Sequence, residues 1–368
     1  MNKNSSSLTG IALHKFKKNL WGVFSFGIIV LFTFFAIFAY VLAPDNSTNA
    51  NQMHLSIHSK PPGFKVLMLE IPSDVATKET GDYLFGFKEN HSEIPLLDYK
   101  ISGDKLIYRE FIDDETLAVP KEISLTQHPH YSSVNSFASE NITEKKFLLG
   151  TDKYGRDLLS RMLVGSRVSI SIGIVAVFIS LVVGIFFGAI GGYYGGKIDA
   201  VVMWLVNIIW SIPTLLLVIA ITLALGKGFW QVFVAVGLTM WVEVARVVRG
   251  QIIGIKEMQY VTAARALGFG SFRIIANHIL PNIMAPVIVI SAANFASAIL
   301  VESGLSFLGL GAQPPIPSWG SIIKDHYSYI ILGKPYLAMV PGIAIMILTL
   351  AFMMTGNALR DALDVRQN

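Results

Sequence analysis

The sequence contains no cysteine among its 368 residues. That absence excludes disulfide bonds, thiolate metal sites and cysteine nucleophiles. Charge is scarce as well, since only 15% of the residues are Asp, Glu, Lys or Arg, whereas soluble domains average about 25%. Hydrophobic residues make up 53% of the chain. This composition is typical of a protein that spans a membrane.

The few charges are unevenly distributed. Residues 44–146 hold 16 acidic and 10 basic residues, and the rest of the chain holds 9 acidic and 19 basic ones. An acidic polar segment within a basic apolar chain indicates two environments. We therefore predict three parts: a tail with a first membrane helix (1–43), an insert outside the membrane (44–146), and a core with five further membrane helices (147–368).

Long apolar runs provide the membrane helices, because about 20 apolar residues cross a bilayer. Five uncharged runs reach that length: Leu20–Ala43, Val168–Ile190, Val201–Leu225, Asn282–Val301 and Pro335–Leu359. A sixth run, from Gly228 to about Val248, is interrupted by Glu243; without it the basic N- and C-terminal regions would lie on opposite sides. Counted in chain order, this run is the fourth span and Asn282–Val301 is the fifth. The first run exceeds the 7–15 apolar residues of a signal peptide, so we interpret it as an uncleaved anchor. The prediction is an all-α membrane protein with six transmembrane helices.

Lysine and arginine set the orientation, because cytoplasmic loops carry an excess of them. Basic residues gather before the first run, between Val248 and Asn282, and after the last run. The short loops of the other side carry three lysines, Lys227, Lys324 and Lys334. Three arginines oppose this assignment, Arg156, Arg161 and Arg167, but they end a loop of more than 100 residues, and long loops translocate largely regardless of charge. Both termini are therefore expected in the cytoplasm, with 44–167 outside.

The insert has β patterning. "FKVLMLEI" (Phe64–Ile71) is strand-like, and "LLDYKISGDKLIYREF" predicts a hairpin that turns at Ser102-Gly103-Asp104. His128 and His130 flank a proline, which is typical of a loop, so no metal site is expected. After the insert, the leucines of "RDLLSRMLVGSR" share one helical face with the arginines opposite, which predicts an amphipathic helix at the membrane interface.

A glycine-rich turn, "GGYYGGKID", matches G-x-x-x-x-G-K, but Ile198 follows the lysine where a magnesium-binding Ser or Thr is needed. A transmembrane helix also precedes it where a phosphate loop has a strand. No other stretch offers a Walker loop, so ATP would have to be used by another chain. Gly184, Gly188 and Gly192, each four apart, predict close packing of the second span against a neighbouring helix.

Ionisable residues inside the spans would mark an ion path, and the apolar runs offer almost none. Glu243 is expected at the inner rim in an i,i+3 ion pair with Arg246, and Glu302 at the outer end of the fifth span. Neither a catalytic base and nucleophile nor a mid-membrane carboxylate is expected. Energy for transport must then enter from outside the spans.

The loop at about 249–280 interrupts the apolar chain with a small-residue, cationic segment, "QYVTAARALGFGSFRIIANHILP". Tyr260 to Leu267 can form a short helix with a thin, alanine-rich profile. Gly268 suits the left-handed end of a helix, and a second helix, Ser271–Leu280, is expected to run to Pro281 at the start of the fifth span. Such a rigid projection could transmit a partner's movement into the membrane.

These residues resemble a known family. "TAARALG…HILP" is similar to the EAA loop of ABC importer permeases: Ala263, Ala264, Gly268, Leu280 and Pro281 match, while Thr262 stands where that family usually has glutamate. "LGTDKYGRDLLSRMLVGSRVS" and "ESGLSFLGLGAQPPIPSWG" resemble segments of the C-type subunit of the oligopeptide/dipeptide (peptide/nickel/opine) permeases. The resemblance covers 147–368 closely and 1–43 loosely, and it implies the type I importer fold.

The resemblance also implies roles and partners. Residues that would dock and couple the ATPase are Tyr260, Thr262, Ala263, Ala264, Arg265, Gly268, Leu280 and Pro281. Motif residues of the outer face are Gly150, Thr151, Asp152, Gly155, Arg156, Asp157, Glu302, Ser306, Phe307 and Gly309. Implied partners are a second homologous permease, two cytoplasmic ATPases, an extracytoplasmic binding protein and the lipid bilayer of a bacterial inner membrane. No nucleic acid, cofactor or enzymatic activity is implied.

Alternatives differ in ligand or in class. Relatives of this family move dipeptides, longer peptides, nickel chelates, opines or sugars. A membrane-anchored sensor would explain the insert but would leave the cytoplasmic projection without a role. An ion-coupled carrier is disfavoured because the predicted spans lack a buried carboxylate.

Overall fold

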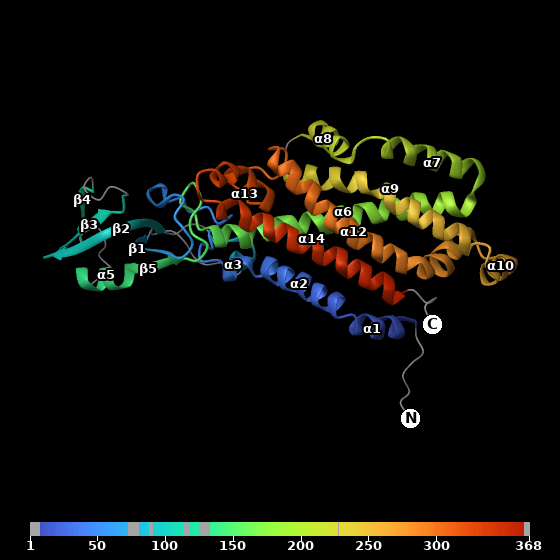
Figure 1. The fold of residues 1–368 in the computed structure, drawn as a ribbon, viewed down its shortest axis with the longest axis horizontal. Helices are drawn as coiled ribbons and strands as arrows, with labels where there is room; N and C mark the ends of the chain where they lie inside the picture. Colours follow the sequence, from blue (N-terminus) through green and yellow to red (C-terminus); the bar gives the residue numbers. More distant parts are fainter. Residues whose placement is uncertain are drawn as a thin grey trace, which may run out of the picture.

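The chain forms a helical bundle with a small β-sheet at one end, as a computed structural model shows (Figure 1). The structure describes residues 8–72, 81–87, 91–112, 118–124, 133–226 and 228–363. Helix α1 (Leu8–Lys18), the end of α14 (Tyr336–Leu363) and the short α10 (Gln259–Ala266) all lie at the end opposite the sheet.

The remaining helices follow in chain order: α2 (Leu20–Ile37), α3 (Ala39–Leu42), α4 (Asp82–Phe85), α5 (Val134–Asn141), α6 (Leu158–Tyr194), α7 (Gly196–Trp210), α8 (Thr214–Leu225), α9 (Phe229–Ile255), α11 (Ser271–Ile274), α12 (Leu280–Phe307) and α13 (Trp319–His326). The strands are β1 (Phe64–Pro72), β2 (His91–Ser102), β3 (Lys105–Glu110), β4 (Pro120–Ser124) and β5 (Ile142–Phe147).

Five helical stretches in the described part of the chain are long and apolar enough to cross a membrane: Leu20–Ile37, Leu158–Tyr194, Phe229–Ile255, Ser271–Phe307 and Tyr336–Leu363. The pair α7–α8 meets the same test jointly, which gives up to six spans. The interrupted sixth run of the sequence is thus a helix of 27 residues.

Helices α6 and α9 form the centre of the bundle, and three glycines let them approach. A Cβ atom at Gly184 would lie 2.5 Å from Val244 Cβ, and one at Gly188 would lie 2.6 Å from the Ala245 carbonyl oxygen. At Gly192 the nearest atom, the Arg249 carbonyl oxygen, would be 3.0 Å away. The predicted close packing of this glycine stripe is confirmed, and α9 is its partner.

The third predicted run is not one straight helix. Helix α7 ends at Trp210, α8 begins at Thr214, and the two meet at 92°. Pro213 explains the break, because proline has no N–H to donate and disfavours helical geometry in the residue before it. Ser211 turns its hydroxyl back to the Ile208 carbonyl oxygen, 2.7 Å away, where the helix would otherwise continue.

The predicted ion pair of Glu243 with Arg246 is wrong. Arg246 instead donates to Asn207 Oδ1 at 2.9 Å, and its guanidinium carbon lies 3.3 Å from the centre of the Trp210 ring. Because α9 continues to Ile255, Glu243 lies near the middle of the helix and not at its rim. It lines a small cavity at the α7–α8 break together with Ile212 and Thr214.

The sheet has the order β4-β3-β2-β1-β5, and every neighbouring pair is antiparallel. The predicted strand at Phe64–Ile71 is β1. The predicted hairpin is β2–β3, in which Ser102 pairs with Lys105 around a turn whose Gly103 has a φ of +61°. Helix α5 covers one face of the sheet, with Phe137 packed among Leu69, Leu96 and Leu106.

The opposite face of the sheet joins the segment that leads to the bundle. Ile57, Val66, Met68 and Phe147 form a separate buried cluster there. Two polar contacts lie in this region. Glu93 of β2 accepts from Lys145 of β5 at 2.7 Å within the sheet, and the Tyr336 hydroxyl of α14 donates to the Lys60 carbonyl oxygen at 2.7 Å. The sheet therefore packs on Ile57 of the preceding segment, and that segment is hydrogen-bonded to α14 through Lys60.

Candidate functional site

Helix α10 projects beyond the ends of α9 and α12 (Figure 1). Val261 and Ala264 are buried against Ile252, Ile279 and Ile283 of the bundle. The other face of the helix is exposed and carries four of the predicted docking residues, Tyr260, Thr262, Ala263 and Arg265. The two faces of α10 therefore differ: the buried face anchors the helix, and the exposed face is free to contact a partner.

The end of α10 has the predicted geometry. Gly268 has a φ of +80°, and Leu267, Gly268 and Phe269 donate their backbone N–H groups to the carbonyls of Ala263, Arg265 and Ala264. The next turn is closed by side chains, because Phe269 stacks on His278 with ring centres 5.8 Å apart and Arg273 lies over Phe269. The loop is a compact unit.

Pro281 does not begin a separate span. Helix α11, a π-helical turn at Ile275–Ile279 and α12 run on as one membrane helix, Ser271–Phe307. A proline cannot donate to the carbonyl four residues earlier and its ring clashes there, and a π turn is one way a helix accommodates such an interruption. The sequence analysis divided this stretch at Pro281 into a loop helix and the fifth span, whereas in the structure Leu280 and Pro281 lie inside one continuous helix.

At the sheet end of the bundle, the segment "GTDKYGRD" folds against residues 54–60. A Cβ atom at Gly150 would lie 2.3 Å from the Lys60 carbonyl oxygen, and one at Gly155 would lie 1.8 Å from that of His54. Thr151 donates its hydroxyl to the Ile57 carbonyl at 2.5 Å and accepts the Lys60 N–H at 2.8 Å. Only glycine fits this close backbone approach at 150 and 155.

Asp152 is fully buried and organises this segment. It accepts the backbone N–H groups of Tyr154 and Arg156 at 2.8 and 3.0 Å, and the Arg156 side chain at 2.7 Å. Arg161 Nε lies 3.8 Å from the same carboxylate. Asp157 then begins α6 as its N-cap by accepting the Ser160 N–H at 2.8 Å, and burial raises the pKa of its carboxyl.

The helix predicted before the second span is present, but it is not a separate interfacial helix with its arginines in water. Leu158–Tyr194 is a single helix of 37 residues, and Arg161 within it is only 4% exposed. The arginine is buried because Asn49 and Ala50 fold over it and offer their carbonyl oxygens to its Nη1 at 3.5 and 3.3 Å. The arginine face of this segment therefore contacts protein and not water.

The second motif forms a polar network on α12 and α13. Glu302 is fully buried and accepts the Ser306 hydroxyl at 2.6 Å, and the Ser318 hydroxyl lies 3.1 Å from that of Ser306. Ser318 also caps α13. Gly309 turns the chain with a φ of +80°, while Phe307 is exposed and packs edge-to-face on Tyr327.

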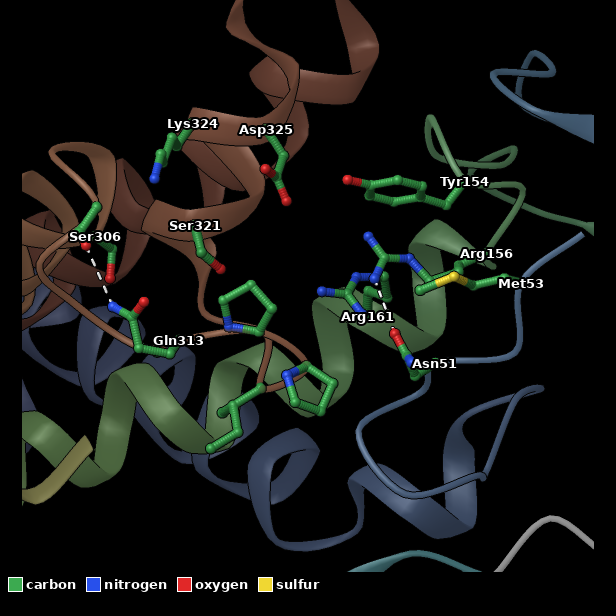
Figure 2. Close-up of a pocket in the computed structure, with 15 residues that line it drawn as sticks. Asn51, Met53, Tyr154, Arg156, Arg161, Ser306, Gln313, Ser321, Lys324 and Asp325 are labelled. Atoms are coloured by element: carbon green, nitrogen blue, oxygen red, sulfur yellow. Dashed lines mark hydrogen bonds between the residues drawn. The ribbon is translucent and has the colours of Figure 1, made fainter. Parts of the chain in front are cut away.

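The two motifs meet at one cavity of about 170 Å³ (Figure 2). Of the predicted residues, Arg156, Ser306 and Gly309 line it, whereas Gly150, Thr151, Asp152, Gly155, Asp157, Glu302 and Phe307 do not. The sequence analysis missed the other polar lining residues, Asn51, Tyr154, Arg161, Gln313, Ser321, Lys324 and Asp325. The one available signal was the unexplained arginines before the second span.

Two contacts between Lys153 and the end of α13 hold that helix to the first motif. Lys153 Nζ lies 3.1 Å from Asp325 Oδ1, and the Lys153 backbone N–H donates to His326 Nε2 at 3.3 Å. His326 Nδ1 lies 2.7 Å from the Ile322 carbonyl oxygen and so carries the proton. Burial lowers the pKa of His326, which keeps it in this neutral form.

Groups of three or more histidine and acidic side chains that could hold a metal are absent from the described ranges. His128 and His130 lie outside the described residues. The "GGYYGGKID" turn joins α6 directly to α7, and Lys256 donates to the Gly192 carbonyl at 3.1 Å there. Its geometry is that of a helix–helix connection.

Two families match the chain. The family described as "Binding-protein-dependent transport system inner membrane component" matches residues 171–368, and the "N-terminal TM domain of oligopeptide transport permease C" matches residues 7–62. The oligopeptide transport system permease protein OppC of Bacillus subtilis is 37% identical over 234 residues, 64% of this chain and 76% of that protein.

Two further relatives are similarly close. The dipeptide transport system permease protein DppC of Bacillus subtilis is 37% identical over 240 residues, 64% of this chain and 75% of the relative. The glutathione transport system permease protein GsiD of Pectobacterium atrosepticum is 36% identical over 237 residues, 64% of this chain and 78% of the relative.

Proposed function

The chain belongs to the binding-protein-dependent transport system inner membrane components, and we propose that it is the permease subunit of an ATP-driven ABC importer of peptides. It lies in a bacterial inner membrane as a multi-pass protein and is not itself an enzyme. Dipeptides or oligopeptides are the proposed substrates, because an oligopeptide permease and a dipeptide permease are matched over about three quarters of their own length.

The proposed topology has six spans, with α7–α8 counted as one broken span, and both termini in the cytoplasm. In that topology the sheet of residues 64–147 lies on the outer side of the membrane, and α10 lies on the cytoplasmic side. The position of α10 at the end opposite the sheet supports this assignment. Since the chain lacks cysteine, a single cysteine at exposed Ala263 should react with an impermeant maleimide in inside-out vesicles, and one at exposed Lys65 in intact spheroplasts. The reverse pattern would invert the topology.

The observation that carries the proposed mechanism is the split of α10 into a buried and an exposed face. In the proposal, an ATPase contacts the exposed face, and its closure moves the anchored loop. Because the loop continues through Leu280 and Pro281 into a single helix of 37 residues, that displacement reaches the far side of the membrane. The spans then alternate between inward- and outward-open states.

The proposed assembly contains a second, homologous permease, two ATPases and an extracytoplasmic binding protein. Its test is ATP-dependent uptake of a labelled dipeptide and a labelled hexapeptide into proteoliposomes that contain all these parts. Uptake should require ATP and this chain. If ATP is hydrolysed but neither peptide enters, peptide import is excluded, and labelled nickel chelates and opines become the substrates to measure.

A further inference from the structure

The cavity at the sheet end has an excess of cationic groups. Among the residues that the structure describes, the charged ones that line it are Arg156, Arg161, Lys324 and Asp325, which are three cations and one carboxylate. Asp325 already faces Lys153 at 3.1 Å. Figure 2 shows both arginine side chains directed into the space between α6 and α13.

The acidic side chains around the arginines are largely used by other donors. Asp152 bonds Arg156 and two backbone N–H groups. Asp45 accepts the backbone N–H groups of Ser47 and Gln52, at 3.0 and 3.2 Å. Asp157 accepts from Ser160. None of these three carboxylates lines the cavity, so they balance charge on the arginines without occupying the cavity.

Arg161 has a hydrogen-bond donor to spare. Its Nε is buried without a hydrogen-bond partner among the described residues, and it lies 3.8 Å from Asp152 Oδ2. A buried donor on a charged group is costly to leave unsatisfied. Arg156 differs, because Asp152 and Asn51 Oδ1 hold it. Arg161 therefore combines a buried donor that makes no hydrogen bond with a place in the cavity lining.

The cavity has room for a ligand group and is open to it. Its volume of about 170 Å³ exceeds the roughly 10–15 Å³ that one water needs on the same measure. Lys324, Pro314 and Pro315 at its rim are exposed. Ser306, Ser321 and Gln313 add neutral polar groups to the lining. Arginine with neutral donors is the set that proteins use to hold planar carboxylates.

We propose that this cavity is a carboxylate-binding site on the outer face of the transporter, with Arg161 and Lys324 as the residues that bind the anion. The proposal rests on the proposed function, because the carboxylate is supplied either by the C-terminus of the imported peptide or by an acidic side chain of the docking binding protein. Both sources supply the same carboxylate group. They differ because a carboxylate of the binding protein would occupy the site without peptide, whereas the other source requires bound peptide.

The experiment uses the complete transporter in nanodiscs and proteoliposomes, with the variants Arg161→Gln and Lys324→Gln. Lys324 is exposed, so its replacement leaves the folded core intact even if Arg161→Gln lowers the melting temperature. Arg167→Gln is the matched control, since Arg167 lies six residues further along α6, over the Tyr40 ring and outside the cavity lining. Two quantities are measured: the Kd of peptide-free binding protein, and the uptake ratio of a peptide to its C-terminal amide.

If a carboxylate of the binding protein occupies the site, the Kd of the peptide-free binding protein should rise at least tenfold in both variants and not in the Arg167→Gln control. A peptide's carboxylate predicts an unchanged Kd and an uptake ratio that falls at least threefold relative to the wild type. Because the binding protein is common to all assays, its own preference for free acids cancels in that comparison. If both quantities stay at wild-type values, the inference is overturned. Failure of the wild-type complex to import either peptide would instead remove the proposed function.

Discussion

At the end of the bundle that carries α10, the loop is held by apolar anchors and backbone caps, whereas at the sheet end the motif residues are held by buried charges. Val261 and Ala264 insert among isoleucines, and Gly268 closes the helix. At the sheet end, Asp152 lies between two arginines, and Glu302 lies within a serine network. Apolar anchoring leaves a surface free for a moving partner, while buried ion pairs fix geometry.

The largest difference between the two ends should follow from removal of the charge at Asp152. Asp152→Asn leaves two buried guanidinium groups without their counter-charge, which costs about 3–5 kcal/mol for a buried pair. We expect little folded protein and a large drop in melting temperature. The control is Asp98→Asn on the sheet, because the side chains of Arg109 and Asp98 are 38% and 45% exposed and ion pairs open to solvent contribute little. Equal stability of the two variants would show that Asp152 is not the organising charge.

The α10 end should respond through function more than through stability. Gly268→Val places a β-branched residue at a φ of +80°, a strain of about 1–2 kcal/mol confined to the loop. ATP hydrolysis should continue while peptide uptake falls several-fold. Gly270→Val is the matched control, because Gly270 has a φ of −65° and open space around its Cβ position. If Gly268→Val and Gly270→Val reduce peptide uptake equally, the cause is the added side-chain bulk and not strain in the turn.

Much of the α10 end could be predicted because it is local. The glycine turn, the short helix and the thin alanine profile depend on residues within ten positions of one another. The hairpin at Ser102–Lys105 is local in the same sense, and it was correct. The π turn was missed because proline can interrupt a helix in several ways, and the sequence pattern does not distinguish among them.

The cavity could not be predicted, because its contacts join distant segments. Arg156 bonds Asn51 over 105 residues, and Lys153 bonds His326 over 173. A helical pattern placed Arg161 on a polar face, and only the fold of residues 49–50 over that face buries it. Glu243 is a similar case: the sequence offers Arg246 three residues away, but Trp210 and Asn207 of α7 take that arginine.

The smallest effect, and the one that sharpens the comparison most, is pH dependence confined to the sheet end. His326 has a lowered pKa because it is buried, and Asp152, Asp325 and Lys153 are the charges near it. In the unfolded chain His326 becomes protonated near pH 6.5, whereas in the folded chain it becomes protonated only at lower pH. Folding stability is therefore lost as pH falls below about 6.5. The slope is at most about 1.4 kcal/mol per pH unit.

The measurement compares melting temperatures of the wild type and His326→Gln from pH 7.5 to 5. The wild type should lose more stability on acidification than the variant does. Asp157, whose raised pKa acts in the opposite direction because its folded form binds the proton more readily, is present in both proteins and cancels. If the melting temperatures of the two proteins fall in parallel with pH, His326 is protonated without loss of stability, although its Nε2 would then no longer accept the Lys153 N–H. In that case acidification would not distinguish the sheet end from the α10 end.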